Sequence, residues 1–316
     1  MVSVLFVDDE PSVLSALKRG FRGLSQNTFF AGSALEGLAL LEQHPIGVVV
    51  SDNNMPEIGG IEFLALVRTR YPDVCRIMLT GKPDLQVAMD AINRCSTSRF
   101  ITKPWKTEEL RTIVEEAIDE YRIVRAMRTG QECVYRALAH TVELKDPYTK
   151  GHCDRVAEYA LQLGVALNLP ERMLEHIRHG SILHDCGKIA VPGAFLNKRG
   201  RLNEDELESI KHHPVKGGEV ARQANLPKEV INIILYHHER YQGGGYPEGL
   251  IGDAIPLEAQ IVALADVYDA LVSTRPYREA MPHAEAIAIM ETAMVGHFDV
   301  TLLKSFIRSI ECTVEK

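Results

Sequence analysis

The chain lacks the features that mark secreted and membrane-spanning proteins. Its six cysteines form neither a C-x-x-C pair nor a regular framework, which favours a reduced cytoplasmic setting over a disulfide scaffold. No uncharged apolar run approaches the roughly 18 residues of a membrane span. The opening segment VSVLFVDDE lacks the charged and long apolar regions of a signal peptide. We therefore expect a cytoplasmic protein with no membrane insertion.

An excess of positive charge is also missing. The chain has 35 Lys and Arg against 43 Asp and Glu, a formal net charge of −8. Proteins that coat nucleic acid or anionic membranes need clustered Lys and Arg, so we expect no direct nucleic-acid binding. The remaining composition, 46% hydrophobic and 25% charged, is ordinary for a globular protein. A length of 316 residues makes two domains the natural expectation.

The first 105 residues alternate between short apolar runs and segments with helical periodicity. Such alternation predicts a parallel sheet covered by helices on both faces, with ligands at the carboxyl ends of the strands. Five strands and a flavodoxin-like α/β fold are expected. The strand segments are VSVLFVDD, TFFAG, GVVVSDNNMP, RIMLTG and RFITKPW, and DLQVAMDAINR is one of the helical segments.

A different pattern begins at Leu110. Apolar residues then follow a 4,3,4,3 spacing among charges, which indicates a helix with a coiled-coil-like seam that Gly130 interrupts. We interpret residues 121–134 as a helical connector between domains 1–120 and 135–316, and as a contact in a homodimer. The seam residues are Leu110, Val114, Ala117, Tyr121 and Val124.

Beyond residue 131 the strand pattern disappears and long helical segments follow. Three of them are VAEYALQLGVALNL, ERMLEHIRHGSILHD and IVALADVYDALVS. Eleven of the twelve histidines also fall in this half. The second domain is therefore expected to be a mostly α-helical bundle with an excess of imidazole groups.

Three carboxylates lie at predicted strand ends of the first domain. Asp8 and Asp9 end the first strand and Asp52 ends the third, and these strands are neighbours in a doubly wound sheet. We expect the acids to converge without nearby cations to neutralise them, and to hold Mg²⁺, which prefers oxygen ligands. Thr80 and Lys103, at the ends of the fourth and fifth strands, add a hydroxyl and a cation suited to a phosphorylated carboxylate.

Over residues 1 to about 120 the sequence resembles the receiver domain of bacterial response regulators. The resemblance implies a cognate sensor histidine kinase as partner and a bound Mg²⁺ ion. The residue roles that it implies are Asp52 as phosphoacceptor, Asp8, Asp9, Asp52 and Asn54 as Mg²⁺ ligands, and Thr80, Phe100 and Lys103 as the switch residues.

Histidines and acids recur in order through the second half. The stretch LYHHERYQGGGYPEGL contains His237 and His238, which diverge by about 100° on a helix and so are not expected to be redundant ligands of one ion. They are interpreted as serving different metals or flanking a shared cluster. Imidazole and carboxylate without thiolate suit Fe, Mn or Zn better than Ca. The other members of the series are His152, His184, Asp185, His212, His213, Asp266 and Asp269.

This series, together with HHE, GGGYP and GDAIPLEAQIVALADVYDALVSTRPYREAM, resembles the HD-GYP branch of the HD phosphohydrolases over residues 135 to 312. Members of that branch hydrolyse cyclic dinucleotides, chiefly cyclic di-GMP. The resemblance implies two divalent metals, Fe or Mn before Zn or Ni, with Asp185 bridging them. The metal ligands it implies are His152, His184, Asp185, His213, His237, His238 and Asp266.

A two-metal centre suits phosphodiester hydrolysis because it activates water and clamps phosphate oxygens. In-line attack would open one linkage and give a linear dinucleotide. For His212 we expect a surface or structural role, and for Asp269 helix packing or support behind the ligands. The expected catalytic residues are His184, Asp185 and Lys188, and the expected substrate contacts are Lys188, Gly244, Gly245, Tyr246, Arg275 and Arg278.

Three positions depart from the family pattern. Gln242 replaces the usual Asp before the glycine loop, and Gln260 replaces the usual Arg before IVALAD. Tyr148 stands where members with three metals carry a glutamate, which favours two metals and a linear product. Two other functions remain open: an adaptor that binds cyclic dinucleotide or a partner protein with little turnover, and a hydrolase of mononucleotides or of cyclic GMP-AMP.

Overall fold

The structure is a computed structural model that describes residues 2–22, 27–81, 99–146, 150–198, 200–274 and 279–314. The chain forms two compact units, Met1–Gly130 and Gln131–Lys316, and the division falls inside the predicted connector. The predicted helix DLQVAMDAINR, as well as Tyr148, Arg275 and Arg278, lies outside the described residues.

The first unit contains a five-stranded parallel sheet in the order β2-β1-β3-β4-β5, which confirms the predicted topology. Val7 of β1 pairs with Ser51 of β3, so Asp8 and Asp52 follow at the same edge of the sheet. The strands are β1 (Ser3–Val7), β2 (Thr28–Ala31), β3 (Ile46–Asp52), β4 (Cys75–Thr80) and β5 (Arg99–Thr102).

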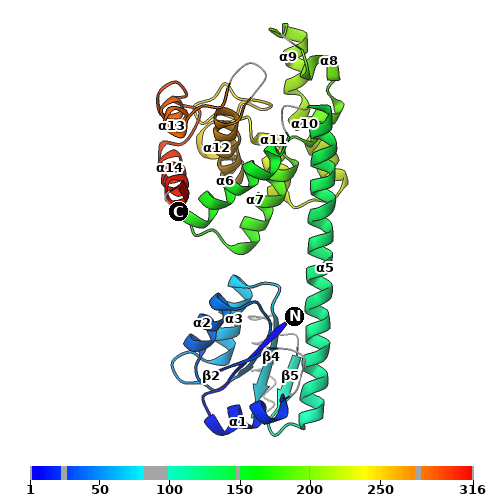
Figure 1. Ribbon diagram of the computed structural model, residues 1–316, viewed down its shortest axis with the longest axis vertical. Helices are drawn as coiled ribbons and strands as arrows, with labels where there is room; N and C mark the ends of the chain where they lie inside the picture. The colour runs from blue at the N-terminus through cyan, green and yellow to red at the C-terminus, as the bar shows by residue number, and fades with distance from the viewer. Residues whose placement is uncertain are drawn as a thin grey trace. The chain divides into compact units, whose positions relative to one another are not determined.

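Helices cover both faces of this sheet (Figure 1). α2 (Ala34–Gln43) and α3 (Gly60–Arg70) pack on one face, and α1 (Pro11–Gly20) and the start of α5 pack on the other. The central strands are buried on both sides, which explains their continuous apolar runs.

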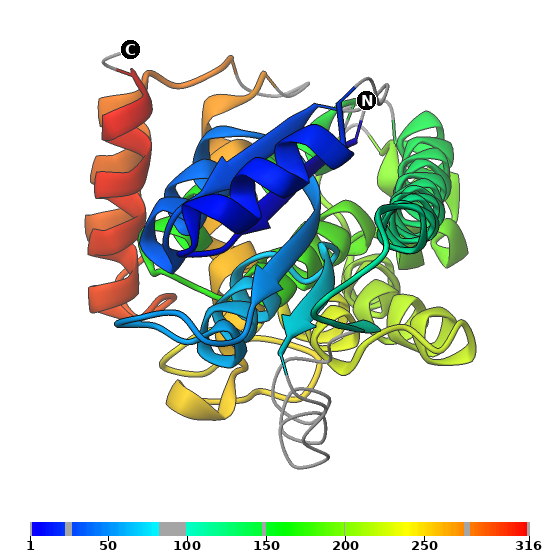
Figure 2. The same ribbon diagram turned by 90° about the horizontal axis from the view of Figure 1, so that it is seen from below.

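α5 runs without a break from Thr107 to Lys145, 39 residues. Figure 1 shows it from the side and Figure 2 nearly along its axis. The predicted interruption at Gly130 is therefore wrong. One glycine costs a helix only about 1 kcal/mol relative to alanine, which the good helix formers around Gly130 offset.

The predicted seam of α5 does not face a partner. Leu110, Val114 and Ala117 are fully buried against the sheet, and Tyr121 packs on the same core. The seam therefore docks the helix on its own domain, and only Val124, at its far end, is exposed.

The second unit is a helical bundle, as predicted. α12 is buried on most of its surface and packs against α6, α7, α11, α13 and α14. Of the described helices, none combines the length and apolar character that crossing a bilayer requires. The helices after α5 are α6 (His152–Ala166), α7 (Glu171–Leu183), η2 (Cys186–Ala190), α8 (Gly193–Leu196), α9 (Glu204–Lys211), α10 (His213–Gln223), α11 (Lys228–Tyr236), η3 (Gly252–Ala254), α12 (Leu257–Val272), α13 (His283–Thr292) and α14 (Val300–Val314).

Candidate metal centre

Histidines and aspartates from five helices meet in the second unit. Two groups of side chains could each hold a metal ion, because their ligand atoms lie within 4.8 Å of one another. Asp185 belongs to both groups. The first group is Asp185, His213, His237 and His238, and the second is His152, His184 and Asp185.

Most of these residues stand at helix ends. His152 begins α6 and His213 begins α10, while His184 and Asp185 follow the last residue of α7. His237 and His238 follow the last residue of α11. Helix ends aimed at one point thus bring together side chains that are distant in sequence.

The structure places His237 and His238 side by side, which favours the shared cluster among the two arrangements expected for them. α11 ends at Tyr236, His237 is its C-cap residue, and the two ring centroids lie 4.1 Å apart. Both fall in the same candidate metal group. The 100° rule applies only inside a helix.

Three buried histidines share one hydrogen-bonding pattern. In His184, His213 and His237, Nδ1 lies 2.6, 2.8 and 3.1 Å from a carbonyl oxygen three residues earlier. A carbonyl only accepts, so Nδ1 carries the proton and Nε2 presents a lone pair.

These lone pairs point into the cluster. His184 Nε2 is buried without a hydrogen-bond partner, and the Nε2 atoms of His213 and His237 face each other at 3.4 Å. Two lone pairs cannot satisfy each other, whereas a divalent cation would satisfy all three. The donor set therefore fits a metal centre.

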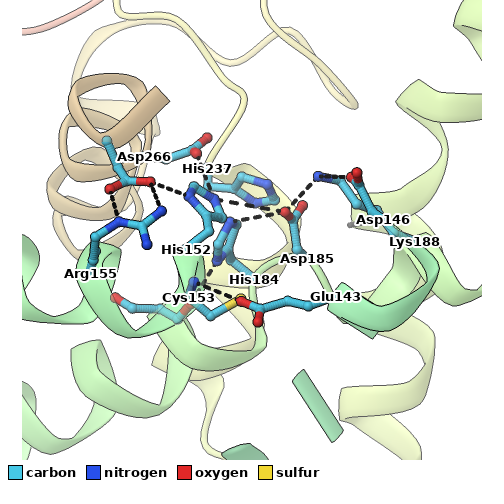
Figure 3. A network of polar contacts seen from close by, with 12 residues as sticks. Glu143, Asp146, His152, Cys153, Arg155, His184, Asp185, Lys188, His237 and Asp266 are labelled. Atoms are coloured by element: carbon cyan, nitrogen blue, oxygen red, sulfur yellow. Dashed lines mark hydrogen bonds and ion pairs between the residues drawn. The ribbon is translucent and has the colours of Figure 1, made fainter. Parts of the chain in front are cut away.

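His152 is held by acids on both ring nitrogens. Nδ1 lies 2.7 Å from Asp269 Oδ2, and Nε2 lies 3.2 Å from Asp266 Oδ1 (Figure 3). Asp269 is almost fully buried and also accepts from Arg155 Nε at 2.6 Å. Asp269 thus supports His152 from behind, in agreement with its expected role.

Burial and neighbouring charge shift the pKa values in opposite directions. Burial lowers the pKa of His237 well below its usual range and that of His238 to about 3, so both imidazoles are neutral. Burial also opposes the charged form of His152, but Asp266 and Asp269 raise the pKa of this residue to about 9. Burial would raise the pKa of Asp185, yet the neighbouring Lys188 ammonium holds it well below its usual value.

Gly187 allows Asp185 to reach the histidines of α10. A Cβ at Gly187 would lie 1.9 Å from the carbonyl oxygen of His213, so only glycine lets η2 pack this closely on α10. Asp185 Oδ1 then lies 3.3 Å from His213 Nε2, and Lys188 Nζ lies 2.6 Å from Asp185 Oδ2.

The glycine loop is tied to the histidine pair. The buried carboxylate of Glu239 accepts hydrogen bonds from the backbone N–H groups of residues 248, 249 and 250 at 2.8, 2.9 and 3.0 Å. A Cβ at Gly245 would lie 2.5 Å from Glu239 Cα. Tyr246 is thereby held with its ring centroid 4.7 Å from that of His238.

Two residues of the site, Glu239 and Arg155, had no role assigned from sequence. Glu239 was visible in HHE. Arg155 carries no comparable sequence signal. His212 is exposed and lies outside both metal groups, in line with its expected surface role.

The two departures that the structure describes have identifiable contacts. The backbone N–H of Gln242 donates to the Gly296 carbonyl at 2.8 Å, and its side chain lies against Gly296. Gln260 Nε2 donates to the carbonyl of Ile255 at 2.8 Å. Both side chains therefore support local loop structure.

The receiver pocket contains a cation among its acids. Lys103 Nζ lies 2.7 Å from Asp8 Oδ2 and 2.6 Å from Asp52 Oδ1, so the expected absence of nearby cations is wrong. The backbone N–H of Asn54 donates to Asp52 Oδ2 at 2.7 Å. Asp9 is exposed.

Two of the three predicted switch residues, Thr80 and Phe100, lie on the last two strands of the receiver sheet. Thr80 ends β4 and is buried, and its carbonyl accepts from Lys103 N at 2.8 Å. Phe100 lies on β5 and is partly buried.

Comparison with protein families matches both units. Residues 4–115 match the response regulator receiver domain, and residues 136–302 match the HD domain. The match to the HD domain covers the histidine and aspartate cluster described above.

Three similar proteins are named as cyclic dinucleotide phosphodiesterases. The cyclic di-GMP phosphodiesterase response regulator RpfG of Xanthomonas campestris is 32% identical over 97% of this chain and 87% of its own. A cyclic di-GMP phosphodiesterase of Thermotoga maritima is 27% identical over 97% of this chain and 90% of its own. The 3'3'-cGAMP-specific phosphodiesterase 3 of Vibrio cholerae is 38% identical over 51% of this chain and 35% of its own. The chain belongs to the response regulators that join an N-terminal receiver domain to a C-terminal HD domain of the HD-GYP type.

Proposed function

We propose that this protein hydrolyses cyclic di-GMP to the linear dinucleotide pGpG at a two-metal site, and that phosphorylation of Asp52 controls the reaction. The observation that carries the proposal is the position of Asp185, which belongs to both candidate metal groups. A carboxylate shared in this way is suited to bridge two cations. The relatives that match nearly the whole chain are named for cyclic di-GMP hydrolysis.

The proposed metal ligands are the residues of the two candidate metal groups together with Asp266. Asp266 is included because its carboxylate lies 3.2 Å from His152 Nε2. Imidazole and carboxylate donors favour Fe or Mn, with Zn and Ni as alternatives. Bound divalent cations would supply Lewis acidity to the phosphodiester and lower the pKa of water.

The chain's own residues supply orientation and charge. The carbonyl bonds at Nδ1 fix the tautomer of three histidines, so their Nε2 atoms need no rearrangement to act as ligands. Lys188, partly buried beside Asp185, is proposed to contact the scissile phosphate. Tyr246, with Lys211 Nζ 5.9 Å from its ring centroid, is proposed to line the substrate face with Gly244 and Gly245. Arg275 and Arg278 are proposed as further substrate contacts.

Cyclic GMP-AMP is the second candidate substrate. The relative specific for it has 38% identity, higher than that of the two full-length relatives, but matches only about half of the chain. We propose cyclic di-GMP as the substrate in place of cyclic GMP-AMP, because the two relatives that match both domains of this chain are named as cyclic di-GMP phosphodiesterases.

We propose that the receiver domain controls the hydrolysis reaction. A receiver domain implies phosphorylation by a kinase. We propose Asp52 as the acceptor, with Asp8, Asp9 and Asn54 holding Mg²⁺ and Thr80, Phe100 and Lys103 responding to the phosphoryl group. The contacts of Lys103 with Asp8 and Asp52 support this assignment.

A homodimer through α5 is also proposed. Four apolar side chains of α5 are each more than half exposed and project within an arc of about 60° around the helix axis. They are Ile123, Met127, Val134 and Leu138. This face is rotated by roughly 110° from the buried seam. Sedimentation equilibrium would give a dimer mass for the wild type and a monomer mass for Leu138→Glu. Equal masses for the two proteins would contradict the proposal.

The function is tested by product identification with cyclic di-GMP and Mn²⁺ or Fe²⁺. We expect pGpG from the wild type, and loss of both bound metal and turnover in His184→Ala and Asp185→Ala. Metal binding without any linear product would remove cyclic di-GMP hydrolysis and leave the adaptor or another cyclic dinucleotide. Full metal content and turnover in either variant would contradict the ligand assignment.

A further inference from the structure

The end of α5 contacts residues next to two of the candidate metal ligands, His152 and Asp185. Three residues, Glu143, Lys145 and the next residue after the helix, Asp146, make these contacts, and we call them the α5 end. In Figure 3, Glu143 lies next to Cys153, and Asp146 lies next to Lys188. All three belong to the second unit.

Glu143 binds the backbone around His152. Its Oε2 accepts from the N–H of Gly151 at 2.9 Å, and its Oε1 accepts from the N–H of Cys153 at 3.3 Å. α6 begins here without a side-chain cap of its own, because its N-cap residue is Gly151. The buried Glu143 carboxylate therefore satisfies N–H groups that would otherwise be orphaned, and fixes the residue that begins α6.

Lys145 binds the segment that follows Asp185. Its Nζ donates to the carbonyls of Ile189 at 2.6 Å and Val191 at 2.5 Å. The ammonium group of Lys145 therefore binds one carbonyl inside η2 and one just after it. The carbonyl of Lys145 in turn accepts from Asn197 Nδ2 at 3.1 Å.

Asp146 reaches the shared acid through Lys188. Its Oδ2 lies 3.8 Å from Lys188 Nζ, which lies 2.6 Å from Asp185 Oδ2. The α5 end therefore contacts the backbone of one metal group and, through Lys188, the residue common to both.

We infer that the α5 end is a positioning element that sets the two metal groups relative to each other, and that receiver phosphorylation alters the site through it. This inference rests on the proposed function and names the residues of its regulation. α5 packs on the receiver core through Leu110 and Val114 and continues unbroken to Lys145. This continuous helix is the path along the chain by which we propose that the receiver acts on the α5 end.

The test uses the full chain loaded with Co²⁺, whose visible absorption reports coordination geometry without turnover. Beryllofluoride serves as the phosphoryl analogue on the receiver. We expect it to shift the Co²⁺ spectrum of the wild type, and expect Glu143→Gln and Lys145→Met to bind Co²⁺ but lose the shift. Lys145→Arg, which can still donate to two carbonyls, should restore it. The matched control is Lys198→Met, a lysine paired with Glu206, which should behave as the wild type.

Turnover supplies a second readout. In Glu143→Gln and Lys145→Met the ratio of kcat with and without beryllofluoride should approach one, with KM within about twofold of wild type, because substrate contacts are untouched. Either a wild type without a spectral shift or variants that retain it would overturn the inference. A shift without any cyclic di-GMP hydrolysis would instead contradict the proposed function and leave the inference standing.

Discussion

Asp269→Asn tests whether the residue behind His152 controls metal affinity. The wild-type carboxylate accepts four hydrogen bonds: one from His152 Nδ1 at 2.7 Å, two from Arg155 at 2.6 and 3.0 Å, and one from Ser273 Oγ at 3.2 Å. Asparagine replaces one acceptor oxygen with an NH₂ donor. In either orientation of the amide, this donor faces Arg155, and in one orientation it also faces His152.

The expected losses of metal affinity and of folding stability follow from these contacts. Loss of a partner behind a metal-ligating histidine typically weakens metal binding by about 10–100-fold, or about 1.4–2.8 kcal/mol. The side chain of Arg155 is 38% exposed, so water compensates part of its lost pairing. The cost in folding stability should therefore be about 1–3 kcal/mol, less than for a fully buried charge pair.

The assay is calorimetric titration of metal-free protein with Mn²⁺, with the unfolding temperature measured on the same samples. Asp205→Asn, at an exposed position in the first turn of α9, is the matched control and should bind Mn²⁺ like the wild type. If Asp269→Asn is folded and its affinity stays within twofold of wild type, Asp269 only packs, and the positioning argument is refuted.

Three further predictions concern single positions. Gly187→Ala places a Cβ 1.9 Å from the carbonyl of His213, so we expect a loss of about 3 kcal/mol or more and a fall of roughly 6–12 °C in the unfolding temperature of the second unit, measured by calorimetry. Gly245→Ala forces the loop away from Glu239, where a Cβ would lie 2.5 Å from Cα; KM for cyclic di-GMP should rise while metal content, measured by elemental analysis, stays at the wild-type level, and an unchanged KM would contradict this. Asp52→Asn should abolish incorporation of phosphate from a small-molecule donor, as seen by mass spectrometry, and residual labelling would place the acceptor elsewhere.

The local pattern of apolar residues was sufficient to predict those elements whose structure depends on residues close in sequence. Strands such as Ile46–Asp52 contain continuous apolar runs because both of their sides are buried, so the parallel sheet could be predicted. The seam of α5 was also detected correctly as a pattern. Its partner was not, because spacing alone does not distinguish packing on the chain's own sheet from packing on a second copy.

The histidine pair illustrates a second limit. His237 and His238 were recognised as candidate ligands, but their placement depended on where α11 ends. Element boundaries are the least reliable part of sequence reasoning, because helix ends are set by caps and tertiary contacts. The position of the helix end therefore decided between the two arrangements that the sequence left open for this pair.

The amino-acid sequence alone determined the two-domain order, the fold class of each part and the kinds of side chain available for metal binding, because periodicity and residue chemistry are local properties. Tertiary structure alone decided that Lys103 pairs with Asp8 and Asp52, and that Glu143 binds the backbone beside His152. These contacts join residues distant in sequence or on different elements. They depend on how whole helices and strands pack, which no window of neighbouring residues records.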